Sequence, residues 1–192
     1  MTDEAAQFGA EQIIHLARLA QGAGGDWALT PAQWTALRFF SRANRFSRTP
    51  SAFSEFHATT RGTASQTVKS LVSMGLLERH RSDTDGRSAR FEVTEAGHAA
   101  LRDDPLEGLV AALKALPESA RAQFTATLCD VAGRLARERE APQFGTCDDC
   151  CHLEHDPQNG GGYCRCADAM LGAQELEALC VEFVPRGADG GN

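Results

Sequence analysis

The residues of this chain best suited to chemistry are cysteines, and six of the seven lie between positions 147 and 180. Cys147 and Cys150 are separated by two residues, a spacing at which two thiolates can reach one metal centre. Cys166 or Cys164, followed by Cys180, can complete a set of four thiolates around the glycines at 160–162. The remaining thiols are alternative ligands or spares, and the alternatives to the set Cys147, Cys150, Cys166 and Cys180 are Cys151 and Cys164.

The number of thiols leaves three kinds of site open. A structural zinc ion accepts four thiolates, an iron–sulfur cluster makes the same demand on the chain, and redox-active thiols need no metal. A disulfide framework is not expected, because disulfides persist in oxidising compartments and the acidic start of the chain is unlike a signal peptide. No apolar run approaches the roughly 18 residues of a membrane span, so we expect a cytoplasmic protein with no membrane partner.

A winged helix-turn-helix is predicted upstream of the cysteines, between positions 51 and 94. Thr60 can cap its second helix, whose apolar residues recur at helical spacing and should face the core: Ala64, Val68, Leu71 and Val72. The residues left outside the core are Arg61, Thr63, Ser65, Gln66 and Lys69. These types suit a helix in a DNA major groove, where Arg and Gln pair with base edges while Ser, Thr and Lys hold phosphates.

Two short strands, 76–81 and 89–93, follow this helix and predict a hairpin. Asp85-Gly86 is a good hairpin turn, and Arg87 beside it would reach a neighbouring minor groove or phosphate. The alternative interpretation is a solvated hairpin with a charged tip, because turns are polar in most proteins.

This order of elements resembles the MarR family of bacterial transcription regulators over roughly residues 5–140. The motifs that carry the resemblance are Gly75-Leu76-Leu77-Glu78-Arg79, Asp83 with Asp85-Gly86-Arg87, and Thr94-Glu95-Ala96-Gly97. The resemblance implies a DNA-binding winged helix in which Arg87 is the wing arginine. It also implies a homodimer interlocked by its terminal helices, which would bind a near-palindromic operator in double-stranded DNA.

The cysteine-rich end lies outside this resemblance in most members of the family. Its pattern, which includes Gly162-Tyr163-Cys164 and Cys180-Val181-Glu182-Phe183, is similar to small iron–sulfur modules. Arg165-Cys166 resembles the corresponding segment of cysteine-tailed MarR-like proteins, which favours Cys166 over Cys164 as a ligand. We therefore favour an iron–sulfur cluster, [4Fe–4S] or [2Fe–2S], over zinc.

The remaining helices are expected from their apolar stripes. Residues 5–20 carry more apolar surface than one small domain needs, so we expect them to lie at a dimer interface together with the helices after Pro105. Cys129, beside Leu128 in the last long helix, is expected to be a small buried hydrophobic residue.

Charge is distributed unevenly along the chain. The formal net charge of −7 argues against a nucleic-acid partner, but residues 31–91 hold ten Lys or Arg against four Asp or Glu. Residues 147–192 hold two Lys or Arg against nine Asp or Glu. A phosphate backbone responds to charge within a Debye length, about 8 to 10 Å, so the acidic end does not cancel the basic segment.

The sequence thus predicts a mainly α protein with a small β-wing. Residues 1–140 would form a winged-helix DNA-binding and dimerisation domain, and residues 141–192 a small loop-rich metal-binding extension. The predicted function is a transcription regulator, not an enzyme, whose cysteine cluster senses redox or iron state. One alternative is a regulator of the same fold that senses a small aromatic ligand and holds a structural zinc. The alternative of another class is an electron-transfer or enzymatic iron–sulfur protein. The sequence argues against an enzyme, because it contains no recognisable nucleophile–base constellation.

Overall fold

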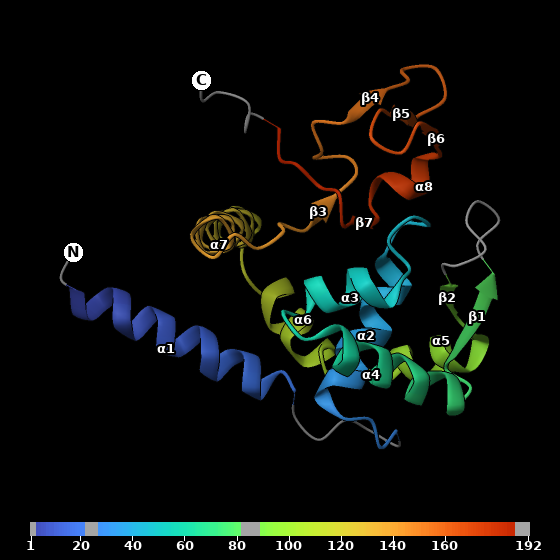
Figure 1. The fold of residues 1–192 in the computed structure, drawn as a ribbon. Helices are drawn as coiled ribbons and strands as arrows, with labels where there is room; N and C mark the ends of the chain where they lie inside the picture. Colours follow the sequence, from blue (N-terminus) through green and yellow to red (C-terminus); the bar gives the residue numbers. More distant parts are fainter. Residues whose placement is uncertain (1–2, 22–26, 82–88, 187–192) are drawn as a thin grey trace.

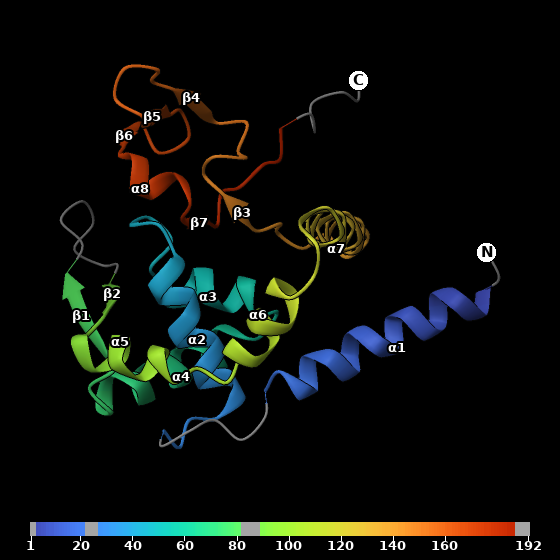
Figure 2. The same cartoon turned by 180° about the vertical axis from the view of Figure 1, so that it is seen from behind.

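A computed structural model describes residues 3–21, 27–81 and 89–186 of the 192-residue chain. Its centre is a winged helix-turn-helix (Figures 1 and 2). The elements of this domain are α2 (Pro31–Arg42), α3 (Pro50–Phe56), α4 (Arg61–Ser73), β1 (Leu77–Arg81), β2 (Ala89–Val93) and α5 (Glu95–Arg102).

Aromatic packing forms the core of the winged helix. Phe39 and Phe40 of α2 and Phe53 of α3 are fully buried, and their ring centroids lie 5.3 to 6.0 Å apart. Phe91 of β2 packs its ring on Phe40 at 6.0 Å. Since each aromatic residue buries a large apolar area, this cluster fixes α2 and α3 against the wing.

Side-chain caps set where the helices begin, as the sequence predicts. The Thr30 hydroxyl accepts from the Gln33 backbone N–H, and the Gln33 side chain accepts from the Thr30 N–H, which completes a capping box. Thr60 caps α4 and Thr94 caps α5 in the same way, each accepting a backbone N–H three residues on. Each such cap contributes about 1 kcal/mol.

The wing strands pair antiparallel in the register Leu77↔Val93 to Arg81↔Ala89. The predicted tip of the hairpin, which includes Asp85-Gly86 and Arg87, lies outside the described residues.

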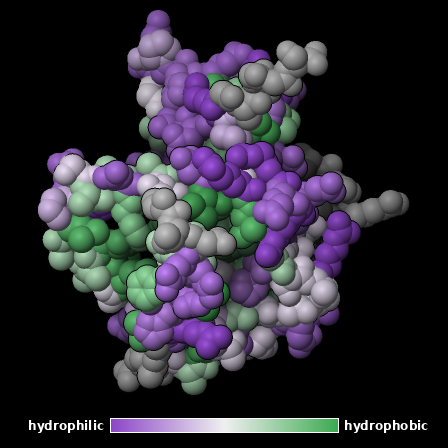
Figure 3. Space-filling view, turned by 90° about the vertical axis from the view of Figure 1, so that its left-hand side faces the viewer, coloured by the Kyte–Doolittle hydropathy of each residue, from purple (hydrophilic) through white to green (hydrophobic). Residues whose placement is uncertain are grey.

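Three helices lie around the winged helix and expose most of their apolar residues. They are α1 (Asp3–Leu19), α6 (Glu107–Lys114) and α7 (Glu118–Glu138), and α6 and α7 contain no buried residue. In α1, which projects away from the rest of the chain (Figure 1), the Phe8 side chain is 62% exposed and that of Leu19 63%. Figure 3 views the molecule from the side of α1 and α7 and shows hydrophobic residues gathered beneath the mainly hydrophilic C-terminal region.

The prediction that Cys129 is buried is wrong. Cys129 lies in α7 and is exposed, because it lines an open groove between α7 and the C-terminal residues. None of the described helices has the length and apolar character needed to cross a bilayer.

The C-terminal cysteine module, residues 145–186, has more regular structure than its sequence suggests. Strand β3 (Gly145–Thr146) pairs with β7 (Leu179–Cys180), and β4 (Leu153–His155), β5 (Gly162–Cys164) and β6 (Ala169–Leu171) form an antiparallel sheet. A short helix, α8 (Ala173–Leu176), connects the two sheets. The module sits above the C-terminal end of α2 and the start of α3 (Figures 1 and 2).

Candidate functional site

Five of the seven cysteines line one cavity of about 250 Å³ in the cysteine module. They are Cys147, Cys150, Cys164, Cys166 and Cys180. All four predicted ligands are therefore brought together, along with the predicted alternative Cys164. Cys151 is not among the residues that line the cavity; its backbone N–H donates to the Val184 carbonyl and its own carbonyl accepts from Arg165.

The two small sheets carry the thiols to the cavity. Cys180 ends β7 and pairs with Gly145 of β3, which places Cys147 beside it two residues later. Cys150 lies in the turn after Cys147, and its N–H donates to the Cys147 carbonyl at 3.1 Å. Gly145 must lack a side chain, because a Cβ there would meet the Phe183 ring at 2.5 Å. The Phe183 ring thus packs directly on Gly145, on one side of the β3–β7 pair beside Cys147 and Cys180.

A hydrogen bond joins the Cys147 and Cys180 side chains. This bond is the main cause that raises the pKa of Cys147, with burial adding to it, and the same bond lowers the pKa of Cys180 to about 6. Cys180 is therefore the more acidic thiol of the pair. A cation entering the cavity would displace a proton from this pair, since metal binding requires thiolates.

The spacing of the thiols suits a group larger than one ion. In a tetrahedral zinc site, Zn–S bonds of about 2.3 Å put the sulfurs about 3.8 Å apart. Among the described residues, one set of three or more potential ligand atoms lies mutually within 4.8 Å, and it contains no cysteine. No three cavity thiols therefore lie mutually within 4.8 Å.

Residues other than cysteines also line the cavity. His152 and Glu182 belong to the cysteine module, whereas Asn44 and Phe46 come from the segment between α2 and α3. Asn44 donates its side-chain N–H to the Cys147 sulfur at 3.5 Å. Asn44 and Cys147 are 103 residues apart in the chain, so no local sequence pattern reveals this contact.

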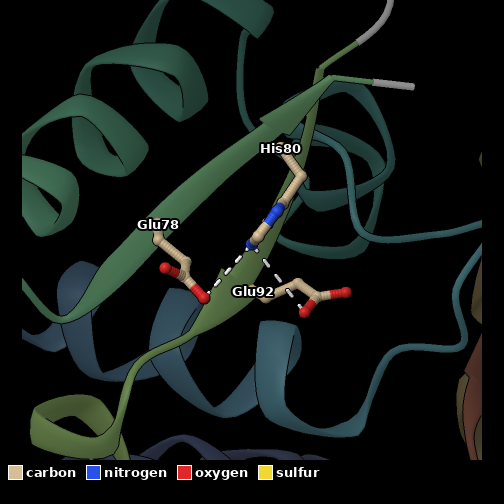
Figure 4. Close-up of side chains that lie close together, drawn as sticks. All are labelled: Glu78, His80 and Glu92. Atoms are coloured by element: carbon tan, nitrogen blue, oxygen red, sulfur yellow. Dashed lines mark ion pairs between the residues drawn. The ribbon is translucent and has the colours of Figure 1, made fainter. Parts of the chain in front are cut away.

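The set of close ligand atoms lies instead on the wing and consists of Glu78, His80 and Glu92 (Figure 4). His80 Nε2 is 3.1 Å from Glu78 Oε1 and 3.9 Å from Glu92 Oε2, and all three side chains are exposed. Glu78 and Glu92 are opposite each other in the strand register, where like charges are destabilising. Arg48 offsets part of that repulsion, because its Nη1 is 3.2 Å from Glu92 Oε1. The three exposed side chains lie together as neighbours on the wing hairpin.

Helix α4 presents the polar face that the sequence predicts. Ala64, Val68 and Leu71 are buried, whereas the side chains of the opposite face are exposed apart from Ser65, which is half-buried: Arg61, Thr63, Gln66 and Lys69. Predicted Arg87 lies outside the described residues. The described part of the predicted DNA-contacting set thus forms one surface along α4.

Burial predicts the order in which the thiols react. We expect N-ethylmaleimide to modify exposed Cys129 well before buried Cys147 and Cys180 in the folded protein, because a buried sulfur is shielded from the reagent. Peptide mass spectrometry over a time course measures this order. Urea-unfolded protein is the control, in which the rates should converge. Equal rates for Cys129 and Cys147 in the folded protein would show that the module is open.

Comparison with known proteins places the fold. Residues 29–88 match the MarR family, and no curated protein matches the sequence. Among solved structures, the transcriptional regulator SlyA is 20% identical with a TM-score of 0.55, and the match covers 72% of this chain and 98% of SlyA. The S. aureus MepR–DNA complex matches at 18% identity and TM-score 0.51, covering 70% of this chain and 98% of MepR. CouR from Rhodococcus jostii, bound to p-coumaroyl-CoA, matches at 17% identity with a TM-score of 0.53, and the match covers 67% of this chain and 92% of CouR.

More than a quarter of this chain lies outside each of these matches. The matched part has the fold of winged-helix regulators, and the identities are too low to carry more than the fold. The residues that match the MarR family, 29–88, include the helix-turn-helix and the first wing strand.

Proposed function

We propose that this protein is a MarR-type transcription regulator whose cysteine module holds an iron–sulfur cluster and senses redox or iron state. The observation that carries the proposal is the cavity in which five thiols meet beside a wall contributed by the winged helix. The proposal assigns DNA binding to the winged helix and sensing to the module. It places the protein in the cytoplasm, where thiols stay reduced.

The DNA-binding half rests on charge and shape. The exposed face of α4 carries Arg61, Gln66 and Lys69 on the segment with an excess of basic residues. MepR, which shares the fold, was crystallised with DNA. A helix with this polar face can enter a major groove and read base edges, and the wing arginine Arg87 would contact the backbone beside it.

The dimer rests on the exposed apolar faces of the outer helices. Phe8, Ile14 and Leu19 of α1 and Val131 and Leu135 of α7 are 44% to 63% exposed. A monomer rarely leaves so many large apolar side chains in water on neighbouring helices. A second copy of the chain is the occupant that the fold favours, and a twofold dimer would bind a near-palindromic operator.

The cluster rests on ligand type and spacing. Thiolates in groups of four are the usual ligands of [2Fe–2S] and [4Fe–4S] clusters. Three of the four assigned thiols are buried and Cys166 is exposed, and no three cavity thiols lie mutually within 4.8 Å, which favours a cluster over one tetrahedral zinc ion. The cluster would supply a redox-sensitive charge, while the residues of the chain hold it. We assign Cys147, Cys150, Cys166 and Cys180 as its ligands, with Cys164 as the alternative inside the cavity.

The second candidate is a regulator that senses a small aromatic ligand and keeps zinc in its module. A groove between α7 and the module favours it, because Phe56, Phe144 and Phe183 line that groove. CouR was crystallised with p-coumaroyl-CoA. The visible absorption of anaerobically purified protein separates the two, since an iron–sulfur protein is brown and a zinc protein is colourless.

We expect substitutions in α4 to change DNA binding in two distinct ways. Lys69→Ala removes a phosphate contact and should lower the salt dependence of binding by about one unit of slope, with little effect on sequence preference. Gln66→Ala should cost about 1 to 3 kcal/mol at one base position only. Fluorescence anisotropy with an operator selected from random duplexes measures both. Lys114→Ala, a basic exposed residue on α6, is the matched control, and an equal loss in that variant would refute the assignment of α4.

A charge placed on the apolar face of α1 should separate the subunits. Ile13→Glu buries a carboxylate in the proposed interface, which costs several kcal/mol, whereas His15→Glu adds the same group on the polar side of the helix. Light scattering should give twice the chain mass of 20.6 kDa for the wild type and His15→Glu, and the single mass for Ile13→Glu. A wild-type protein that is monomeric at micromolar concentration and still binds DNA tightly would exclude the dimer.

Serine substitution identifies the ligands. Cys147→Ser, Cys150→Ser, Cys166→Ser and Cys180→Ser should each lose iron and labile sulfide, because an alcohol is a poor replacement for a thiolate ligand. Exposed Cys129→Ser is the matched control and should keep both. Iron and sulfide are assayed after anaerobic purification, together with Cys151→Ser and Cys164→Ser. Full iron content in all four ligand variants means that the assignment is wrong.

A further inference from the structure

The thiol cavity is closed partly by the winged helix itself. We call residues 43–48, between α2 and α3, the linking segment. Its Asn44 and Phe46 line the same cavity as the cysteines. Whatever occupies the cavity therefore touches both the module and the segment that joins the first two helices of the DNA-binding domain.

Backbone and side-chain bonds attach the linking segment to the module. The Asn44 N–H donates to the Leu179 carbonyl at 2.8 Å, and the Val181 N–H donates to the Ser47 hydroxyl at 2.9 Å. Leu179 and Val181, the module residues that make these two bonds, lie on either side of Cys180 in the sequence. Arg45 adds an ion pair with Glu175 of α8, which lies on the far side of the same junction.

Asn44 is the side chain that joins the two halves most directly. It is 2% exposed, and its Nδ2 donates to the Cys147 sulfur at 3.5 Å. Its Oδ1 accepts from the backbone N–H groups of Phe46 and Ser47, at 3.1 and 2.9 Å. One buried amide thus contacts a candidate ligand with one end and holds the turn of the linking segment with the other.

The other end of the linking segment is bonded to the DNA-binding elements. Arg48 Nε donates to the Ala43 carbonyl, and the Phe91 N–H of β2 donates to the Arg48 carbonyl, both at 3.0 Å. Arg48 also pairs with Glu92 on the wing, the residue shown beside His80 in Figure 4. Thr49, the next residue, caps α3. A shift of the linking segment would therefore reach both α3 and the wing.

We propose that the occupant of the thiol cavity controls DNA binding through the linking segment of its own subunit, with Asn44 as the positioning residue. This inference rests on the proposed function and adds the structural path by which the cavity would act on DNA binding. A sulfur bound to a cation carries more negative charge than a free thiol and is a stronger acceptor for the Asn44 N–H. Loading the cavity then tightens the turn that Asn44 holds, and emptying it loosens the turn. Such a link needs no change in subunit spacing.

The test measures a ratio of affinities in the full-length protein. The wild type is reconstituted anaerobically with ferrous iron and sulfide, or stripped with a chelator, and each form is titrated against the DNA duplex that the loaded form selects from a random library. The ratio is the DNA affinity of the loaded form divided by that of the stripped form. Energetic coupling between sites is typically 5- to 150-fold in affinity, and we expect the wild-type ratio to lie in that range.

Two substitutions separate the sulfur contact from the turn. Asn44→Asp keeps the oxygen that accepts from Phe46 and Ser47 but loses the N–H that contacts Cys147, whereas Asn44→Ala loses both. We expect both variants to keep their iron, to show a ratio near one, and to have a shifted reduction potential, because hydrogen bonds to sulfur set cluster potentials. Asp104→Asn is the matched control. Asp104 is a buried polar residue of the same domain that accepts from the Leu106 N–H and pairs with Arg38, and its variant should keep the wild-type ratio and potential.

The outcomes distinguish this inference from the function on which it rests. A wild type that takes up no iron or selects no DNA refutes the proposed function itself. A wild-type ratio that persists in Asn44→Asp overturns the inference while leaving that function intact. Loss of iron from Asn44→Asp also overturns it, because Asn44 would then support the cluster and not the coupling.

Discussion

The constraint on which the cysteine module depends is that five cysteines line one small cavity. The module buries few large apolar side chains, chiefly Leu153, Leu171 and Leu176, and its remaining core is cysteine. Apolar burial on this scale contributes only a few kcal/mol, and short segments of this kind usually need a metal or disulfides to stay folded. The Cys147 and Cys180 side chains are hydrogen-bonded to each other. A positively charged occupant, such as the proposed cluster, would displace a proton from this pair and stabilise the folded module.

The same cavity ties the module to the winged helix, because part of its wall belongs to residues 43–48. Phe46 packs against the module's small core, and Phe144 at the module's edge packs edge-on against Phe56 of α3 with ring centroids 5.0 Å apart. The junction thus joins two aromatic contacts and several buried hydrogen bonds. A junction of this kind moves between discrete arrangements more readily than it deforms smoothly, because packed interiors resist compression. The position of the module on α2 and α3, and not on α7 alone, makes the DNA-binding domain its nearest neighbour.

The sequence predicted the parts of the fold that local chemistry decides. Capping residues such as Thr30 and Thr60, and the turn-and-strand pattern of the wing, place their elements because the relevant hydrogen bonds span three or four residues. Gathering the predicted thiols in one cavity needed only their spacing and their type. Strands β3 and β7 could not be predicted, because two-residue strands paired across more than thirty positions have no periodicity. Asn44 was missed for the same reason, and the exposure of Cys129 was missed because an apolar stripe does not say whether the chain or another subunit covers it.

Charge bears on how the two halves communicate. The module is acidic and the winged helix is basic, so direct electrostatic competition with DNA is a natural first explanation for control. The module, however, lies against α2 and the start of α3, and α4 lies on the other side of the domain in both ribbon views (Figures 1 and 2). Interactions between exposed charges fade beyond a Debye length of about 8 to 10 Å. Arg45 of the linking segment is already paired with Glu175, while Arg61 and Lys69 on α4 are exposed to solvent. The proposed control through contacts at residues 43–48 would therefore persist at physiological salt, whereas control through the field of the acidic module would be screened.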